Sequence, residues 1–564
     1  MTNRQNATGE KTIPLYKYIG LFSAILGISD CYNIKAMINN SFCEKVSDFI
    51  LDYTNYLISL RCNSVIGFQD YMTDQMCFSD RIKSDSYYSD LFKNFFNLNS
   101  FNKFKREWLL YCKQEFKIED TWLVLDGSNI DCKSKGVELS EKGYSKSKNN
   151  SNVISFSYTI TEDGLPVTYD LFRGQLVDSK SIKNTIDFLN EFDVNVKGVI
   201  IDRGFCTKDC LDYLKDKKIN YEVMLKKNTC GFTEMVEKYG DEVKFNVDYL
   251  VENTSLFAIQ DECKLFKNSD DKDVVTLFYD TVNAASRIDS LLKGIYEEKD
   301  RIEKLINSGM SYAINQKYIK YINIDENKNI VLNKEALKKD LKTKGLYTIA
   351  NNERYLPSVI YNRYKKRQGG EKQYSIIKTQ LGFYTARIHD TPALYAKFFI
   401  AFIATIFRYF IACASDKCKK DTNTVIRELN KIYMSRFNKR FLHSSSETDF
   451  QKEIFQSLDL DISILDTVAQ LENDRLDGKL PKIKYRKYIN QQSDNSSNNV
   501  NDGQKKRGVP KGTKRGMYNK DGSLRKKPGP STKDKSEDSN LSQIEQNSSI
   551  TRNHSGHPRG EIIP

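Results

Sequence analysis

The hydrophobic pattern of the first 118 residues predicts helices. Large apolar residues recur at spacings of three and four from residue 14 to 118, as in FCEKVSDFILDYTNYLISL. The pattern changes at 120–126 (DTWLVLD), a short apolar run that ends in an acid. A helical N-terminal region is therefore expected to give way to strands near residue 120.

Alternating strands and helices follow. The segment VISFSYTI (153–160) alternates as a strand does, and Asp163-Gly164 before LPVTYDLF (165–172) predicts a hairpin. Strands are then expected at 195–202 and 221–226, separated by helical patterns. This order predicts a mixed α/β sheet.

The pattern loosens between 227 and 343, where a long helical stretch (SRIDSLLKGIYEEKDRIEKLINS) follows strand-like pieces, and we interpret this part as an insertion. A strand resumes at 344–350 and helices follow. The predicted organisation is a helical N-terminal domain at 1–118, the first part of a catalytic core at 119–230, an insertion at 231–343, the second part of the core at 344–420, a helical region at 421–490 and a disordered basic tail at 491–564.

Composition argues against a membrane protein and against a zinc site. The most apolar run, FFIAFIATIF (398–407), is too short to span a bilayer and predicts a buried helix. Residues 1–13 lack the apolar stretch of a signal peptide. The 12 cysteines form no CxxC pair and there are only 4 histidines, which is typical of reduced core thiols in a cytoplasmic protein.

Positive charge is concentrated near the C-terminus. Residues 505–530 hold 10 Lys/Arg and one acid, a charge of 10 − 1 = +9, which leaves 13 − 9 = +4 for the rest of the chain. The segment resembles an AT-hook, but Val509 stands where that motif has its arginine. Nonspecific attraction to DNA phosphates is therefore favoured over minor-groove recognition, and a solubilising tail is the alternative. The candidate DNA contacts there are Lys505, Lys506, Arg507, Lys511, Lys514 and Arg515.

Two aspartates end apolar strands: Asp126 follows WLVL and Asp202 follows GVII. The ends of strands in an α/β sheet present side chains to a ligand crevice. Paired carboxylates without histidine are suitable ligands for two Mg²⁺ ions, which Mn²⁺ can replace. Two such ions can promote the cleavage of a phosphodiester. Simple strand-terminating turns are the alternative. A two-metal site also needs a further acid.

Glu371 is a candidate for that acid. It is the only acid in YNRYKKRQGGEKQYSIIK (361–378). At about 100° per residue, a helix would place Tyr364, Arg367, Glu371 and Lys378 within an arc of about 60°. This stripe could hold a metal and grip DNA phosphates, or it could be an exposed face with an Arg367–Glu371 pair.

The spacing Tyr364-x2-Arg367-x3-Glu371-x6-Lys378 resembles the YREK signature of DDE-class insertion-sequence transposases of the insertion sequence four group. LVLDGSNI and GVIIDRGFCTKDCLDYL resemble the strands with the first and second Asp of this family, and the resemblance spans about 119–412. It implies a ribonuclease H-like fold interrupted by a β-containing insertion. It also implies Asp126, Asp202 and Glu371 as metal ligands, and Tyr364, Arg367 and Lys378 as DNA contacts.

The resemblance further implies a bacterial, nucleoid-associated enzyme that cuts double-stranded DNA at inverted-repeat ends and joins the 3′-OH to target DNA, as a homodimer. The N-terminal helices would help to bind the ends. Gly369 and Gly370 depart from the family, which places bulky residues before the Glu, and Ser128 replaces a frequent Thr. Two alternatives stay open: a decayed or repurposed DNA-binding protein, and a ribonuclease H-like nuclease without strand transfer.

Overall fold

The computed structural model describes residues 15–479 with short gaps. The gaps are residues 95–97, 144–151, 175–177, 327, 384–386 and 445, and the side chains of residues 178, 179, 370, 371 and 373 are also outside the description. The predicted tail at 491–564, with its six candidate DNA contacts, lies outside the described residues.

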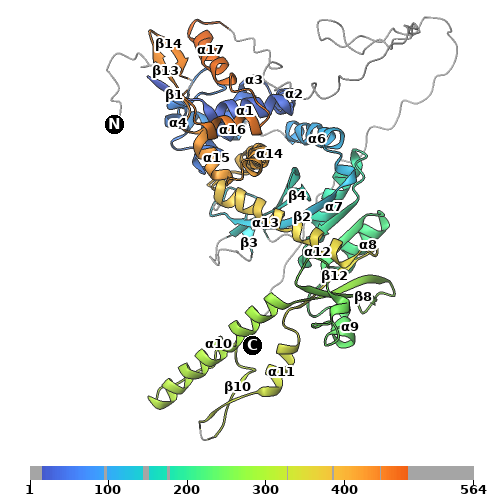
Figure 1. The fold of residues 1–564 in the computed structure, drawn as a ribbon. Helices are drawn as coiled ribbons and strands as arrows, with labels where there is room; N and C mark the ends of the chain where they lie inside the picture. The colour runs from blue at the N-terminus through green and yellow to red at the C-terminus, as the bar shows by residue number, and fades with distance from the viewer. Residues whose placement is uncertain are drawn as a thin grey trace, which may run out of the picture. The chain divides into compact units, whose positions relative to one another are not determined.

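Helices make up the first part of the chain, as the spacing of its apolar residues predicts (Figure 1). They are α1 (Gly20–Cys31), α2 (Ile34–Ser41), α3 (Glu44–Leu60), α4 (Phe68–Asp74), α5 (Asp85–Asn94) and α6 (Leu98–Glu115). Their apolar faces join one continuous core with the sheet that follows.

A nine-stranded mixed sheet forms the centre of the fold. Its strands are β2 (Trp122–Asp131), β3 (Glu141–Lys142), β4 (Asn152–Thr161), β5 (Pro166–Arg173), β6 (Gly198–Ile201), β7 (Asn220–Met224), β8 (Leu256–Lys264), β9 (Lys272–Asp280) and β12 (Leu346–Asn351). The order is β3-β4-β2-β6-β7-β12-β9-β8, and β5 pairs with β4. The predicted mixed α/β sheet is confirmed.

Within this sheet, an antiparallel meander is followed by parallel strands. The hairpin β4–β5 is confirmed, with Gly164 at φ 98° in the turn, where a side chain would be strained. Helices α7 (Asp178–Glu191) and α8 (Lys208–Asp216) lead into β6 and β7, which run parallel to β2. Each parallel connection therefore carries a helix, as such crossovers require.

The segment predicted as an insertion contributes to two different cores. Its strands β8 and β9 extend the main sheet through β12. The later part, 291–341, has a small core of its own around Leu291, Ile295, Ile302, Tyr321 and Ile322. The elements of the segment besides β8 and β9 are α9 (Cys230–Tyr239, which begins one residue earlier), η3 (Val247–Tyr249), α10 (Thr281–Asn307), β10 (Ile322–Ile324), β11 (Ile330–Leu332) and α11 (Lys334–Lys342).

Helix α14 (Thr391–Lys417) runs through the main core. By length and hydropathy it could cross a membrane, but 83% of its most apolar window is buried inside the protein. It packs against α3, α5 and β5. The buried helix expected around 398–407 is therefore confirmed and is longer than the apolar run alone suggests.

The last described part contains a small sheet beside helices. Strand β1 (Tyr16–Tyr18) pairs with β13 (Tyr433–Phe437), which pairs with β14 (Arg440–His443). The region predicted as helical at 421–490 thus also contains a hairpin. Its helices are α15 (Thr422–Leu429), α16 (Asp449–Ser457) and α17 (Ile464–Leu476).

Candidate active site

Asp126 and Asp202 come from neighbouring parallel strands. The register of β2 and β6 pairs Leu125 with Ile201. Asp126 is the next residue of β2, and Asp202 directly follows the last residue of β6. Because adjacent strands lie about 4.8 Å apart, these places put the two aspartates side by side. Both side chains are partly exposed. The two strand positions inferred from the sequence are therefore brought together.

The prediction that β2 ends at Asp126 is wrong. The strand continues to Asp131, because Gly127 to Asp131 keep pairing with β4. What ends at this level is β6, after Ile201. From Asp126 onward β2 therefore has a neighbour on one side only. This opening between β2 and β6 is the crevice where α/β sheets bind ligands.

The segment with the YREK spacing is not one regular helix. Helix α12 (Pro357–Lys366) ends at Lys366, with Arg367 as its C-cap. Helix α13 (Gln368–Ser375) begins at the next residue, and a π-helical segment covers Ile376–Gln380. The break falls just before Gly369, which fits the low helix propensity of glycine. The residues of the stripe nevertheless converge on the two strand ends.

Arg367 and Tyr364 lie beside Asp202. The guanidinium Nη1 of Arg367 is 3.8 Å from Oδ1 of Asp202, and the guanidinium lies over the Tyr364 ring at 5.5 Å. Burial raises the pKa of Tyr364 well above its usual value, and the charges of Asp202 and Asp126 raise it further. The buried Tyr364 hydroxyl has no hydrogen-bond partner among the described residues. It is thus a protonated donor close to both carboxylates.

Two other side chains fix the same segment to β2. Nζ of Lys378 donates to Oγ of Ser128 at 2.8 Å, and the Tyr374 hydroxyl donates to the backbone carbonyl of Asp126. The sequence analysis did not select Tyr374. At about 100° per residue, this position falls about 20° outside the arc that contains Tyr364, Arg367, Glu371 and Lys378. A wider arc would have included it.

Glu371 lies in α13, and its side chain is outside the described part of the structure. Its helix position is framed on both sides by residues that touch the strand ends. Arg367 stands four positions before it, and Tyr374 and Lys378 stand three and seven positions after it. Within α13 itself, positions 371 and 374 lie three apart and therefore on the same side of the helix.

A buried ion pair anchors α12 behind the site. Nη1 of Arg363 is 3.3 Å from Oε2 of Glu222 on β7, and the guanidinium lies over Trp122 at 3.9 Å and Tyr355 at 4.4 Å. Burial raises the pKa of Glu222 to about 8, and Arg363 offsets only part of that rise. Sequence patterns gave no signal for this pair, since a single Glu in a strand and one Arg of a basic run are each unremarkable.

A cavity of about 340 Å³ lies beside Asp202 and is strongly positive. Its charged lining residues are Arg203, Lys227, Arg287, Lys365, Arg367 and Asp280, a sum of 5 − 1 = +4. Burial and the nearby cations Lys344 and Arg287 lower the pKa of Lys227. Such a cluster of cations favours an anionic ligand.

The described residues provide two of the ligands that a divalent cation would need. No group of three His, Cys, Asp or Glu side chains that could hold a metal occurs among the residues whose side chains are described. The carboxylates of Asp126 and Asp202 are hard oxygen donors of the type that Mg²⁺ prefers. They fit part of a metal site, and Glu371 is the one predicted ligand whose side chain is not described.

Comparison with known proteins finds a family model for part of the chain. The model described as "Transposase DDE domain" matches residues 118–233, a segment that includes Asp126 and Asp202 but not Glu371. This match supports a DDE-class transposase domain. Among solved structures, "Mos1 transposase paired-end complex with left transposon end" is similar at 12% identity and a TM-score of 0.13. That match covers 31% of this chain and 57% of the other, and no curated protein sequence matches.

Proposed function

We propose that the protein is a DDE-class DNA transposase of the insertion sequence four group, with Asp126, Asp202 and Glu371 as its metal ligands. The observation that carries the proposal is the register of β2 and β6, which puts Asp126 and Asp202 side by side where β6 ends, within the matched segment. The strand order β5-β4-β2-β6-β7, with an antiparallel meander followed by parallel strands, supports the ribonuclease H-like fold. The positive cavity beside Asp202 supports a DNA substrate.

The residues around the strand ends have distinct roles in this proposal. When bound, a pair of Mg²⁺ ions supplies Lewis-acid activation and neutralises charge on the phosphodiester. Arg367 orients the Asp202 carboxylate, and Lys378 brings a positive charge to the same opening. The Tyr364 hydroxyl stays protonated and offers a hydrogen bond to a phosphate oxygen.

The reaction then needs no covalent enzyme intermediate. Water attacks the phosphorus at the end of the mobile DNA, and the bond from phosphorus to the 3′ oxygen breaks, which leaves a 3′-OH on the mobile DNA and a 5′-phosphate on the flanking DNA. In a second step at the same site, this 3′-OH attacks a phosphorus of target DNA, forms a new phosphodiester and expels a 3′-OH of the target strand. Such chemistry rests on positioning and electrostatics rather than on a side-chain nucleophile. Because two ends must be joined, we propose a homodimer in the complex and a bacterial cytoplasmic, nucleoid-associated location.

The test uses the full-length protein and duplexes taken from the DNA that flanks this gene. We expect Mg²⁺-dependent cleavage of the duplex, stopped by EDTA, and joining of a pre-cut end to a plasmid. Cleavage without joining would instead identify a nuclease. Binding without cleavage in either Mg²⁺ or Mn²⁺ would identify a decayed or repurposed DNA-binding protein and would refute the proposal.

Replacing Gly369 by alanine tests whether the glycine pair marks a decayed enzyme. A Cβ at this position would meet Cδ1 of Ile160 at 3.5 Å, an ordinary contact, and the backbone is not left-handed. We expect Gly369→Ala to raise the free energy of unfolding by about 0.5–1 kcal/mol, as is usual for this change within a helix. Urea denaturation measures this gain.

Cleavage by Gly369→Ala should equal or exceed that of the wild type, because a firmer α13 holds position 371 more steadily. A stable Gly369→Ala variant that no longer cuts would show instead that the glycine is needed for close approach of the substrate.

A further inference from the structure

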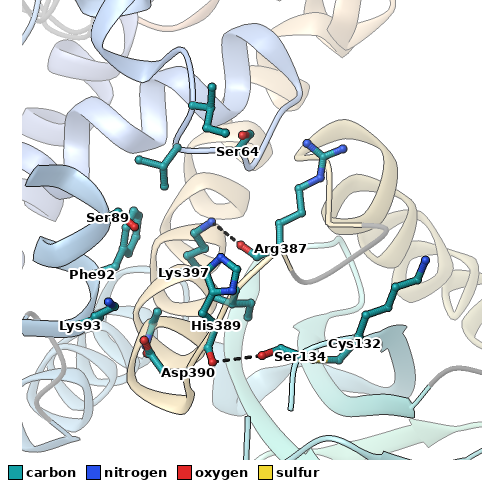
Figure 2. A pocket seen from close by; sticks show the side chains of 15 residues that line it. Ser64, Ser89, Phe92, Lys93, Cys132, Ser134, Arg387, His389, Asp390 and Lys397 are labelled. Atoms are coloured by element: carbon teal, nitrogen blue, oxygen red, sulfur yellow. Dashed lines mark hydrogen bonds between the residues drawn. The ribbon is translucent and has the colours of Figure 1, made fainter. Parts of the chain in front are cut away.

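A second cavity, of about 620 Å³, lies away from the strand ends. Four segments surround it: residues 64–66, helix α5, residues 132–134 just beyond β2, and residues 387–397 at the start of α14 (Figure 2). It thus opens where the N-terminal helices meet the sheet. Neither the predicted metal site nor the YREK stripe includes any of its residues.

The walls of this cavity are closely fitted. Oγ of Ser134 donates to the carbonyl of His389 at 3.1 Å. A Cβ at Gly136 would lie only 2.2 Å from that carbonyl oxygen, so only glycine permits the approach. The segment after β2 and the segment before α14 are therefore held together as one wall.

The cavity carries an excess of positive charge. Its charged residues are Lys93, Lys133, Arg387, Lys397 and Asp390, a sum of 4 − 1 = +3. The one carboxylate is engaged, because Oδ1 of Asp390 accepts from the backbone N–H of Ala393 and caps α14. Among the residues that the structure describes, neither Lys133 nor Arg387 forms an ion pair.

One of these positive charges, that of Lys397, is buried inside the protein. Its side chain is almost fully buried, at 3% exposure, and Nζ donates to the carbonyls of Asn63 at 2.8 Å and Arg387 at 3.3 Å. Burial lowers the pKa of Lys397 to about 8. No carboxylate within the described part of the chain pairs with it. A buried cation without a counter-ion is costly, and an anion in the cavity would offset that cost.

The position of the cavity relative to Asp126 points to DNA as the source of the anion. Both lie along β2, and the six residues from Asp126 to Cys132 span about 20 Å at about 3.3 Å per residue. One strand of B-DNA carries a phosphate about every 3.4 Å of axis, so about six phosphates fit this span. Lys133 and Arg387 are exposed and line the cavity, so both can be reached by a DNA strand from solvent.

We propose that this cavity binds one backbone phosphate of the DNA substrate, about six nucleotides from the phosphodiester that is cut. The proposal rests on the proposed function for the identity of the ligand. Lys133 and Arg387 contact the phosphate, and the ammonium of Lys397 behind them supplies a fixed positive potential. A free phosphate or mononucleotide would share this chemistry, so the test must separate the two sources.

The first measurement is the salt dependence of DNA binding in EDTA, with the full-length protein and a labelled duplex from the gene flank. For Lys133→Ala and Arg387→Ala, we expect binding about five- to tenfold weaker at low salt, and a slope of log K against log salt that is smaller by about 1. Lys452→Ala, which removes an exposed lysine of α16, is the matched control and should leave the slope unchanged. Slopes equal to wild type in both cavity variants would overturn the proposal.

The second measurement replaces single phosphates of the duplex by neutral methylphosphonates. We expect one position, about six nucleotides from the cut, to weaken binding by the wild type clearly more than binding by Arg387→Ala, in which only the contact of Lys133 is left to lose. If the methylphosphonate and Arg387→Ala weaken binding independently at every position, so that their effects add, the proposed phosphate site is refuted. If inorganic phosphate or dAMP raises the melting temperature of the wild type but not of the variants, while the DNA slopes agree, the ligand is a free anion and the DNA proposal fails.

These binding measurements do not depend on cleavage. A protein with the expected slopes and the single sensitive phosphate that never cuts DNA would refute the proposed function and keep the phosphate site. If the protein cuts DNA with Mg²⁺ but the cavity variants have the salt slope of the wild type, the proposed function stands and the phosphate site is refuted. Lys397→Met is a further variant of the same cavity. If Lys397→Met does not fold, the variants of the exposed Lys133 and Arg387 still test the proposal.

Discussion

Replacing Asp126 by asparagine should lower the rate of DNA cleavage at least about a thousandfold and leave the fold intact. The loss follows because an amide cannot supply the negative charge that two divalent cations need, and effects of this size are usual when one main electrostatic group of an active site is removed. Asp202→Asn should behave in the same way, since the register gives both aspartates equivalent places. Gel assays of labelled end duplex with saturating Mg²⁺ measure the rate.

The stability of the aspartate variants should move in the opposite direction. Asp126 and Asp202 are like charges at neighbouring positions, so neutralising Asp126 relieves repulsion and should keep or raise the melting temperature without metal. Asp202→Asn also removes the partner of Arg367, so its gain should be smaller. Asp216→Asn, at the exposed end of α8, is the matched control and should retain full cleavage. If Asp126→Asn cuts DNA at the full rate, Asp126 is not a metal ligand. Glu371→Gln tests the third proposed ligand in the same way, by its rate of cleavage.

Replacing Arg363 by methionine should cause the largest loss of stability among the changes considered. The guanidinium lies over Trp122 and Tyr355 and is hydrogen-bonded to the buried Glu222. Its removal should cost about 2–3 kcal/mol near neutral pH, through the lost ring contacts and hydrogen bond. The cost should reach about 3–5 kcal/mol near pH 9, where the Glu222 carboxylate would be buried without its cation. Chemical denaturation over this pH range measures the change.

The direction of the pH effect follows from the raised pKa of Glu222. The folded protein holds this proton more tightly than the unfolded chain, so the contribution of Glu222 is fully present below about pH 4.5 and is lost as pH rises through about 8. Arg363→Met raises the pKa further and deepens the loss above pH 8. Adding Glu222→Gln to this variant should remove the pH dependence. A loss that is the same at both pH values would show that Glu222 is not buried as a charge.

The sequence was sufficient for the elements that depend on local pattern. The hairpin at Gly164, the strand before Asp202 and the buried helix around 398–407 all follow from periodicity and turn chemistry. The pairing of Asp126 with Asp202 was also accessible, because each aspartate follows a short apolar strand. These are features in which a few neighbouring residues determine the outcome.

Features that depend on distant partners could not be predicted. β2 continues past Asp126 because β4 pairs with it, and its own polar residues there give no strand signal. The Glu222–Arg363 pair joins residues 141 apart, and the cavity around Lys397 joins four segments of the chain. In each case the deciding interaction is a tertiary contact with no sequence periodicity.

The burial of α14 against α3 and α5 has a consequence for the order of synthesis. The N-terminal helices leave the ribosome first, but the helix that covers their apolar faces is encoded at Thr391–Lys417. Contacts between such distant segments close slowly, and the exposed surfaces are prone to aggregate while they wait. The nascent chain therefore carries uncovered apolar helices through most of its translation, and fragments released before residue 417 are expected to be substrates for chaperones and proteases rather than stable domains.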